Sequence, residues 1–144
     1  MFTSVNSRAA SAYRRVAAET SVQGASPHQL VGLLFTALLQ SIATARGALQ
    51  RGDIPAKGAA LGKAVRIIEE GLKAGLNLRE GGEIAANLHQ LYDYSVLRLT
   101  QGNRHNDTAA LEEVARLIEP VAESWKLING NGPAYLQPVA GREV

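Results

Sequence analysis

The chain has 144 residues, 46% of them hydrophobic and 19% charged, a length that favours one domain with a substantial core. It has no cysteine, which excludes disulfides and thiolate chemistry, and its net charge of +2 comes with scattered arginines, which argues against nucleic-acid binding. No run approaches the roughly 20 apolar residues of a membrane span, and the first residues lack a signal-peptide core, so we expect a cytoplasmic protein without membrane insertion.

The first 25 residues combine small and polar side chains with isolated apolar ones, and we interpret them as an N-terminal arm, partly helical around residues 9–18. A helix start follows. Ser26 can accept hydrogen bonds from the free N–H groups of a first turn, and Pro27 sits where its missing N–H costs nothing. The first long helix is therefore expected over residues 27–51.

Apolar residues cover about two-thirds of the wheel of this first helix, against roughly a 100° stripe for a helix on a protein surface. Two interpretations remain open: the helix is surrounded at the centre of a bundle, or it has a core face and a second face for a partner. The apolar arc consists of Leu30, Val31, Leu33, Leu34, Phe35, Ala37, Leu38, Leu39, Ile42, Ala45 and Leu49.

A short turn is predicted where the first helix ends, with Gly52 in a left-handed conformation and Asp53 as the cap of the next helix. A turn this short makes the two helices antiparallel. The second helix is expected over residues 54–76. It contains four glycines, and because each costs up to about 1 kcal/mol of helix propensity, we expect close approach of a neighbouring backbone at Gly62 and Gly71.

Two glycines in the second turn, residues 77–82, permit unusual backbone angles, and the third helix is expected to run from there to about Gly102. Tyr94 and Leu97 fall outside its core face, although a solvated helix face is not normally so apolar. This surplus of apolar residues is the main clue to a partner-binding surface. The core face is predicted to hold Ile84, Leu88, Leu91, Ser95 and Leu99.

A third turn at residues 103–107 ends with Asp107 as the cap of a fourth helix, which reaches about residue 128. Pro120 lies opposite the core stripe of this helix and is expected to kink it outward. The stripe is spaced as a helix requires, with Leu111, Val114, Ile118, Val121, Trp125 and Ile128.

Four amphipathic helices joined by short turns, with no strand-like alternation, predict an all-α fold, an antiparallel up-down four-helix bundle. The expected organisation is an N-terminal arm at 1–25, with or without a short extra helix, and one bundle domain at 26–128. The tail at 129–144 is rich in glycine and proline and is expected to be disordered.

Motifs for catalysis or cofactor binding are mostly absent. Residues 58–63, GAALGK, have three residues between the glycines where a phosphate loop needs four, lack the following Ser or Thr, and lie inside a helix. His89 and Asp93, one helical turn apart, could hold two positions of a metal site, but a surface hydrogen bond is the favoured interpretation. We therefore expect no enzyme, no cofactor and no metal site.

Several segments between Tyr13 and Ile128 stand in a characteristic order and spacing: ASPHQL at 25–30, RGDIPAKGAALGKAVRIIEEGLKAGL at 51–76, GGEIAANLHQLYDYSVLRL at 81–99, and NRHNDTAALEEV at 103–114, followed by Trp125. Together they are similar to the FliS family of flagellin secretion chaperones. The resemblance implies a four-helix bundle with an N-terminal arm. It also implies a cytoplasmic protein that binds the disordered C-terminal region of flagellin, prevents premature polymerisation, and helps to deliver flagellin to the flagellar type III export gate.

Under this resemblance, the surplus apolar residues become candidates for flagellin contact, because a client that folds on its chaperone must bury apolar anchors. Leu34 and Leu38 lie near the centre of the first apolar arc, so a plain core role is the competing interpretation for them. Asn87 could hydrogen-bond a client backbone or only contact solvent. The full set of candidates is Leu34, Phe35, Leu38, Asn87, Tyr92, Tyr94, Val96 and Leu97.

In the arm, Tyr13 and Val16 resemble a family motif that covers the empty client groove and contacts the export gate. Two features depart from the family pattern. Around Phe35 the chain reads LFTALLQS, without the acidic residue and glycine that commonly follow the aromatic and that the resemblance associates with polar client contacts. Pro120 interrupts a helix that the family generally leaves continuous.

A function from another class fits the same residues. The chain could be a non-enzymatic helical adaptor or regulatory protein that binds a folded partner or associates with itself, as in a homodimer. Binding of the C-terminal flagellin segment would separate the two functions.

Overall fold

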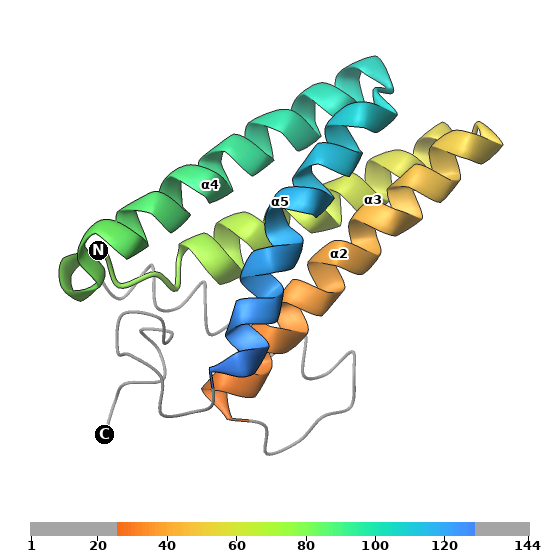
Figure 1. The fold of residues 1–144 in the computed structure, drawn as a ribbon. Coiled ribbons are helices and arrows are strands. Elements are labelled where there is room, and N and C mark those ends of the chain that lie inside the picture. Colours follow the sequence, from red (N-terminus) through yellow and green to blue (C-terminus); the bar gives the residue numbers. More distant parts are fainter. Residues whose placement is uncertain (1–25, 129–144) are drawn as a thin grey trace.

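The computed structural model describes residues 26–128, and the predicted arm and tail lie outside the described residues. Four helices follow one another: α2 (Pro27–Arg51), α3 (Ile54–Arg66) with its π-helical continuation η1 (Ile67–Lys73), α4 (Leu78–His105) and α5 (Thr108–Leu127). Consecutive helices run in opposite directions (Figure 1). The predicted all-α four-helix bundle is confirmed.

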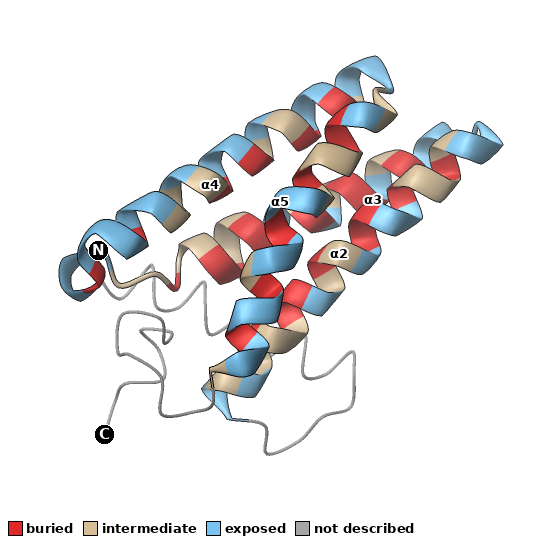
Figure 2. Ribbon diagram, in the orientation of Figure 1, coloured by how far each residue is buried: buried red, intermediate tan, exposed pale blue. Residues whose placement is uncertain are grey.

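The four helices form a closed ring of neighbours. α2 packs against α3 on one side and α5 on the other, and α4 completes the ring through contacts with α5, η1 and α3. Buried residues line the inner side of each helix, while exposed residues follow the outer sides (Figure 2). This is the arrangement that amphipathic helices adopt when each must bury one apolar face.

Side-chain caps begin the helices. Ser26 and Gln29 form a reciprocal capping box, in which the Gln29 amide donates to Ser26 Oγ at 3.1 Å and the Ser26 amide donates to Gln29 Oε1 at 2.8 Å. Asp53 caps α3 and Asp107 caps α5, each accepting from a backbone amide of the first turn at 3.1 and 3.0 Å. These predicted caps are confirmed. Asn77 caps α4 in the same way.

Two glycines adopt backbone conformations that other residues rarely reach. Gly52 closes α2 with φ of 75° and ψ of 17°, the left-handed conformation predicted from the sequence. Gly82 has φ of 56° and ψ of −136° and interrupts α4 after its first turn. The main body of α4 therefore begins after Gly82, although a helical turn already starts at Leu78.

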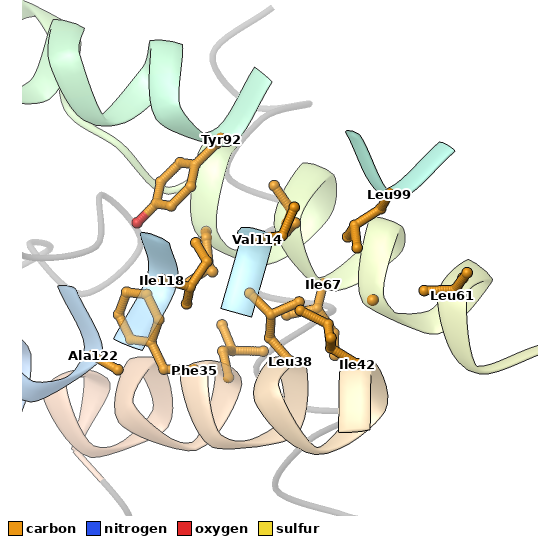
Figure 3. Close-up of a cluster of buried hydrophobic side chains, with 14 of the residues drawn as sticks. Phe35, Leu38, Ile42, Leu61, Ile67, Tyr92, Leu99, Val114, Ile118 and Ala122 are labelled. Atoms are coloured by element: carbon orange, nitrogen blue, oxygen red, sulfur yellow. The ribbon is translucent and has the colours of Figure 1, made fainter. Parts of the chain in front are cut away.

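The core lies where the four inner faces meet. Figure 3 shows Leu38 and Ile42 of α2 pointing toward Val114 and Ile118 of α5, with Leu99 of α4 in the same cluster. All five side chains are buried. Two adjacent helices thus contribute aliphatic side chains at helical spacing, as the predicted stripes require.

The second helix departs from the prediction, because it is not one continuous α-helix. From Ile67 to Lys73 it is π-helical, and both Ile67 and Ile68 are buried. A π-helical turn holds more residues than an α-helical turn, so it presents more consecutive side chains to the core. The expected close approach at Gly62 is wrong: a Cβ there would meet only the guanidinium of its own neighbour Arg66, at 3.7 Å.

Two features noted in the sequence are the apolar character of α2 and the proline within α5. By length and composition alone α2 would qualify as a membrane span, but the core helix of a soluble protein passes the same test. Residues along α2 are buried against other helices, which accounts for its apolar character. α5 continues through Pro120, which is exposed as expected, while the outward bend expected there stays a prediction.

Candidate functional site

Four of the candidate client-binding residues lie in the core and not on the surface. Leu34 and Leu38 are fully buried, and Phe35 and Tyr92 are nearly so. In Figure 3 the Tyr92 ring points from α4 into the cluster that contains Phe35 and Leu38. For Leu34 and Leu38 this burial confirms the core interpretation. The expectation that Phe35 and Tyr92 are accessible is corrected, because α3, η1 and α5 cover the inner side of α2 and Tyr92 lies on the inner side of α4.

The other candidates lie at or near the surface of α4. Tyr94 is 40% exposed and Leu97 is 52% exposed, which agrees with their position off the predicted core face. Asn87 is exposed and Val96 is half-buried. Tyr13 and Val16 lie outside the described residues. Among the described residues, the accessible candidates therefore all lie on α4.

α4 and α5 meet most closely near the turn that joins them. A Cβ atom added to Gly102 would lie 2.5 Å from Cδ1 of Leu111 and 3.2 Å from Cβ of Ala110, so a larger residue here would force these side chains to shift. From this turn the two helices separate toward their other ends (Figure 1). A missing side chain thus permits close helix packing at Gly102, which it does not do at Gly62.

One side of α4 becomes more exposed with distance from Gly102. Ile84 precedes Ser95, and Leu88 precedes Leu99, by slightly more than three helical turns, so each pair lies on the same side of α4. Ser95 and Leu99 are fully buried, whereas Leu88 is half-buried and Ile84 is 47% exposed. The prediction that Ile84 is a core residue is wrong, because the separating helices leave its side of α4 uncovered, whereas the adjacent Ala85 is fully buried.

Apolar residues of α5 follow the side of the helix that contacts α4. Glu113 of α5 is in hydrogen-bond contact with α4, and Leu117 and Val121 follow it by one and two turns on the same side. Leu117 is 36% exposed and Val121 is half-buried. We call the combined set the α4–α5 apolar surface. It consists of Ile84, Leu88, Leu91, Leu117 and Val121.

A polar bridge borders the α4–α5 apolar surface on the side of the turn. The Tyr94 hydroxyl donates to Glu113 Oε2 at 2.6 Å, and Arg98 Nε donates to Glu113 Oε1 at 2.7 Å. The hydrogen bond from Tyr94, followed by that from Arg98, lowers the pKa of Glu113 below its ordinary value. The same hydrogen bond raises the pKa of Tyr94, because it stabilises the protonated hydroxyl.

A second accessible site is a groove of about 390 Å³ between α2 and α5. Phe35 borders it, so one predicted partner-facing residue lies beside a hollow even though its own side chain is buried. In the sequence this groove is marked only weakly, by Gly32, a small residue on the arc of α2 that the apolar residues do not cover. The lining residues are Gln29, Gly32, Leu33, Phe35, Thr36, Leu39, Ala122, Glu123 and Lys126.

The described residues offer no constellation for metal chemistry, since no three His, Asp or Glu side chains come together among them. His89 Nδ1 lies 3.3 Å from Asp93 Oδ2, which matches the predicted surface contact. Asp93 also pairs with Lys73 at 2.6 Å, and this contact lowers the pKa of Asp93. What the accessible surfaces offer is apolar area for binding.

Comparison with known proteins agrees with this description. The family described as flagellar protein FliS matches residues 9–132. A flagellar secretion chaperone FliS of Salmonella typhimurium is 51% identical over 118 residues, which cover 82% of this chain and 87% of that protein. The flagellar secretion chaperone FliSB of Pseudomonas aeruginosa is 44% identical over 113 residues, covering 78% and 89%. A Bacillus subtilis relative named flagellar secretion chaperone FliS is 33% identical over 108 residues, covering 75% and 79%.

Proposed function

Because the chain belongs to the FliS family, which is a family of chaperones and not of enzymes, its role is that of a flagellar export chaperone, and we propose that its client is flagellin. In this proposal the protein binds the disordered C-terminal segment of flagellin in the cytoplasm. It thereby prevents premature polymerisation and assists delivery to the flagellar type III export gate.

The observation that carries the proposal is the α4–α5 apolar surface, continued by Tyr94 and Leu97 on α4. A disordered client loses conformational entropy when it folds on a chaperone and must recover that cost by burying apolar anchors. An amphipathic client helix laid against half-buried apolar side chains would supply such burial. Accessible apolar side chains along two neighbouring helices are suited to this task.

Direct client contact is assigned to accessible residues. Tyr94 and Leu97 supply apolar contact, and Asn87 supplies hydrogen bonds to the client backbone. Phe35 is reached only by a client segment seated in the α2–α5 groove. The other candidates have an indirect role, because they pack in or against the core and hold α2 and α4 in place. They are the buried Leu34, Leu38 and Tyr92 and the half-buried Val96. Contact of Tyr13 and Val16 with the groove or the export gate belongs to the same proposal.

A titration with the C-terminal segment of flagellin from the same organism tests the proposal. We expect a saturable one-to-one complex, a gain of helix by circular dichroism, and a negative heat-capacity change by calorimetry. Absence of binding at micromolar concentrations contradicts flagellin as the client. Self-association of the chain without client binding would instead favour a helical adaptor.

A paired substitution locates the site. Tyr94→Ala with Leu97→Ala should weaken the complex and leave the melting temperature nearly unchanged, because both side chains are largely outside the core. The matched control is Ile54→Ala with Leu127→Ala, which removes two exposed apolar side chains from the start of α3 and the end of α5. If the control weakens binding as much as the test pair, the client lies elsewhere.

A further inference from the structure

Two hydrogen bonds from α4 end on one carboxylate of α5. The Tyr94 hydroxyl donates to Oε2 of Glu113 at 2.6 Å, and Arg98 Nε donates to Oε1 at 2.7 Å. Arg98 is itself held by Gln101, whose Oε1 accepts from Arg98 Nη1 at 2.8 Å. Tyr94, Arg98 and Glu113 form a bridge between α4 and α5 at the point where the α4–α5 apolar surface begins.

The bridge restrains the ring of Tyr94, which is partly exposed to solvent. Tyr94 is 40% exposed, yet its hydroxyl is anchored on the neighbouring helix, so its ring spans the seam between α4 and α5. An anchored aromatic side chain has already lost much of its rotamer freedom before a partner arrives. A partner that packs on this ring therefore meets a smaller ordering cost than on a free tyrosine.

The bridge also prepares Glu113 for burial. A client covering the seam would remove the carboxylate from water, which is costly for an unpaired charge. Here both oxygens already have donors, one of them the cation of Arg98. Arg116 also lies close enough to favour the charged carboxylate, and Asp107 is near enough to act on Arg98.

We propose that Glu113 is a positioning residue of the client-binding surface. It holds the Tyr94 ring across the α4–α5 seam, where the ring forms one end of the apolar surface and packs against an apolar side chain of the client. This inference rests on the proposed function, and it adds that the polar bridge, and not only the apolar area, determines client affinity.

A double-mutant cycle tests the proposal with the full chain and the C-terminal flagellin peptide. Tyr94→Phe keeps the ring and removes the donor, while Glu113→Ala removes the acceptor. Each should weaken the peptide affinity by about threefold to tenfold, the range that one hydrogen bond supports. The double variant should lose little more than either single variant, because both remove the same contact.

The matched control is Glu112→Ala. Glu112 is the neighbouring carboxylate on α5 and bridges to Arg46 at 2.9 Å, so it makes a comparable contact with α2 in place of α4. We expect it to leave peptide affinity unchanged. Melting temperatures of all variants show whether a change in affinity only follows a change in stability.

The pH dependence of peptide affinity is a further test, because a purely structural role of Glu113 would not make the effect of its substitution depend on pH. Because the pKa of Glu113 is lowered, the bridge is present above the ordinary value of 4.5 and is lost as the pH falls through the lowered pKa. The affinity ratio between the wild type and Glu113→Gln should therefore shrink at acid pH. A constant ratio overturns the inference.

The possible failures are distinguishable. If the wild-type chain does not bind the peptide, both flagellin as client and the inference are overturned. If the wild type binds and the effects of Tyr94→Phe and Glu113→Ala add, or neither variant weakens binding, the inference alone is overturned.

Discussion

The indole nitrogen of Trp125 donates a hydrogen bond to the backbone carbonyl of His28 at 2.8 Å, and its ring stacks on the His28 imidazole with the ring centroids 4.6 Å apart. This contact ties the last turn of α5 to the first turn of α2. The ring of Phe35 on α2 also lies near Trp125, with the ring centroids 6.5 Å apart.

Trp125→Phe should lower the free energy of unfolding by about 1–2 kcal/mol, since it removes the hydrogen bond and part of the stacked ring. Urea unfolding followed by circular dichroism measures this, because the variant lacks the chain's single tryptophan. Leu127→Ala, two residues away and 86% exposed, is the control and should change the value by less than about 0.5 kcal/mol. Equal effects would show that the contact with His28 is not stabilising.

Gly102→Ala should destabilise the bundle by about 1–3 kcal/mol, because the added methyl group would overlap Leu111 and Ala110. The control is Gly58→Ala within α3, where a Cβ would have no heavy atom within 4 Å. That substitution should stabilise the protein by about 0.5–1 kcal/mol through helix propensity. Thermal and urea unfolding give both values, and the same sign for the two variants would contradict the packing argument.

Lys57→Met should destabilise the protein by about 1–3 kcal/mol. Lys57 is only 4% exposed, and its ammonium donates at 2.7 Å to the backbone oxygen of Asn103 and at 2.7 Å to Oδ1 of Asn106. Methionine keeps the aliphatic stem but leaves both acceptors at the end of α4 without this donor. Lys126→Met, which removes an exposed ion pair with Glu123, should cost less than about 0.5 kcal/mol. An unchanged melting temperature for Lys57→Met would contradict the prediction.

Stability should depend on pH through the pair of Lys73 and Asp93. The hydrogen bond from Lys73 lowers the pKa of Asp93 below 3.8, so its contribution is present above pH 3.8 and is lost as the pH falls through the lowered pKa. The same bond raises the pKa of Lys73 above 10.5, so that contribution is present below pH 10.5 and is lost as the pH rises further.

We therefore expect Asp93→Asn to melt below the wild type at neutral pH, with the difference shrinking under acid conditions. Melting curves from acid to neutral pH check this. Glu123→Gln is the control, because its pair with Lys126 is exposed and 3.4 Å long. A difference that stays constant with pH would exclude the ion pair as its cause.

The sequence predicted the helices and their caps well, because these depend on local chemistry. Ser26, Asp53 and Asp107 are short polar residues that can accept from free amides, and no distant part of the chain changes that. The π-helical segment was missed. Its hydrogen-bond pattern leaves no distinct mark on apolar spacing over seven residues.

The candidate site was only partly predictable, because a helical wheel orders residues around an axis but does not say where neighbouring helices end. Tyr94 and Leu97 were correctly placed outside the core face. Tyr92 was placed on the surface although the bundle buries it, and Ile84 was placed in the core although α5 has moved away from α4 at that level. Glu113 carries no apolar signal, so only the structure shows that it meets Tyr94.

The π-helical segment Ile67–Lys73 also bears on changes in chain length. Deleting one residue inside an ordinary α-helix rotates every later side chain by about 100° and turns core residues toward solvent. Deleting one residue inside this segment would instead convert its wider turn to an α-helical turn while the flanking faces keep their orientation. The bundle therefore has one place where its length can shorten by a residue without loss of register.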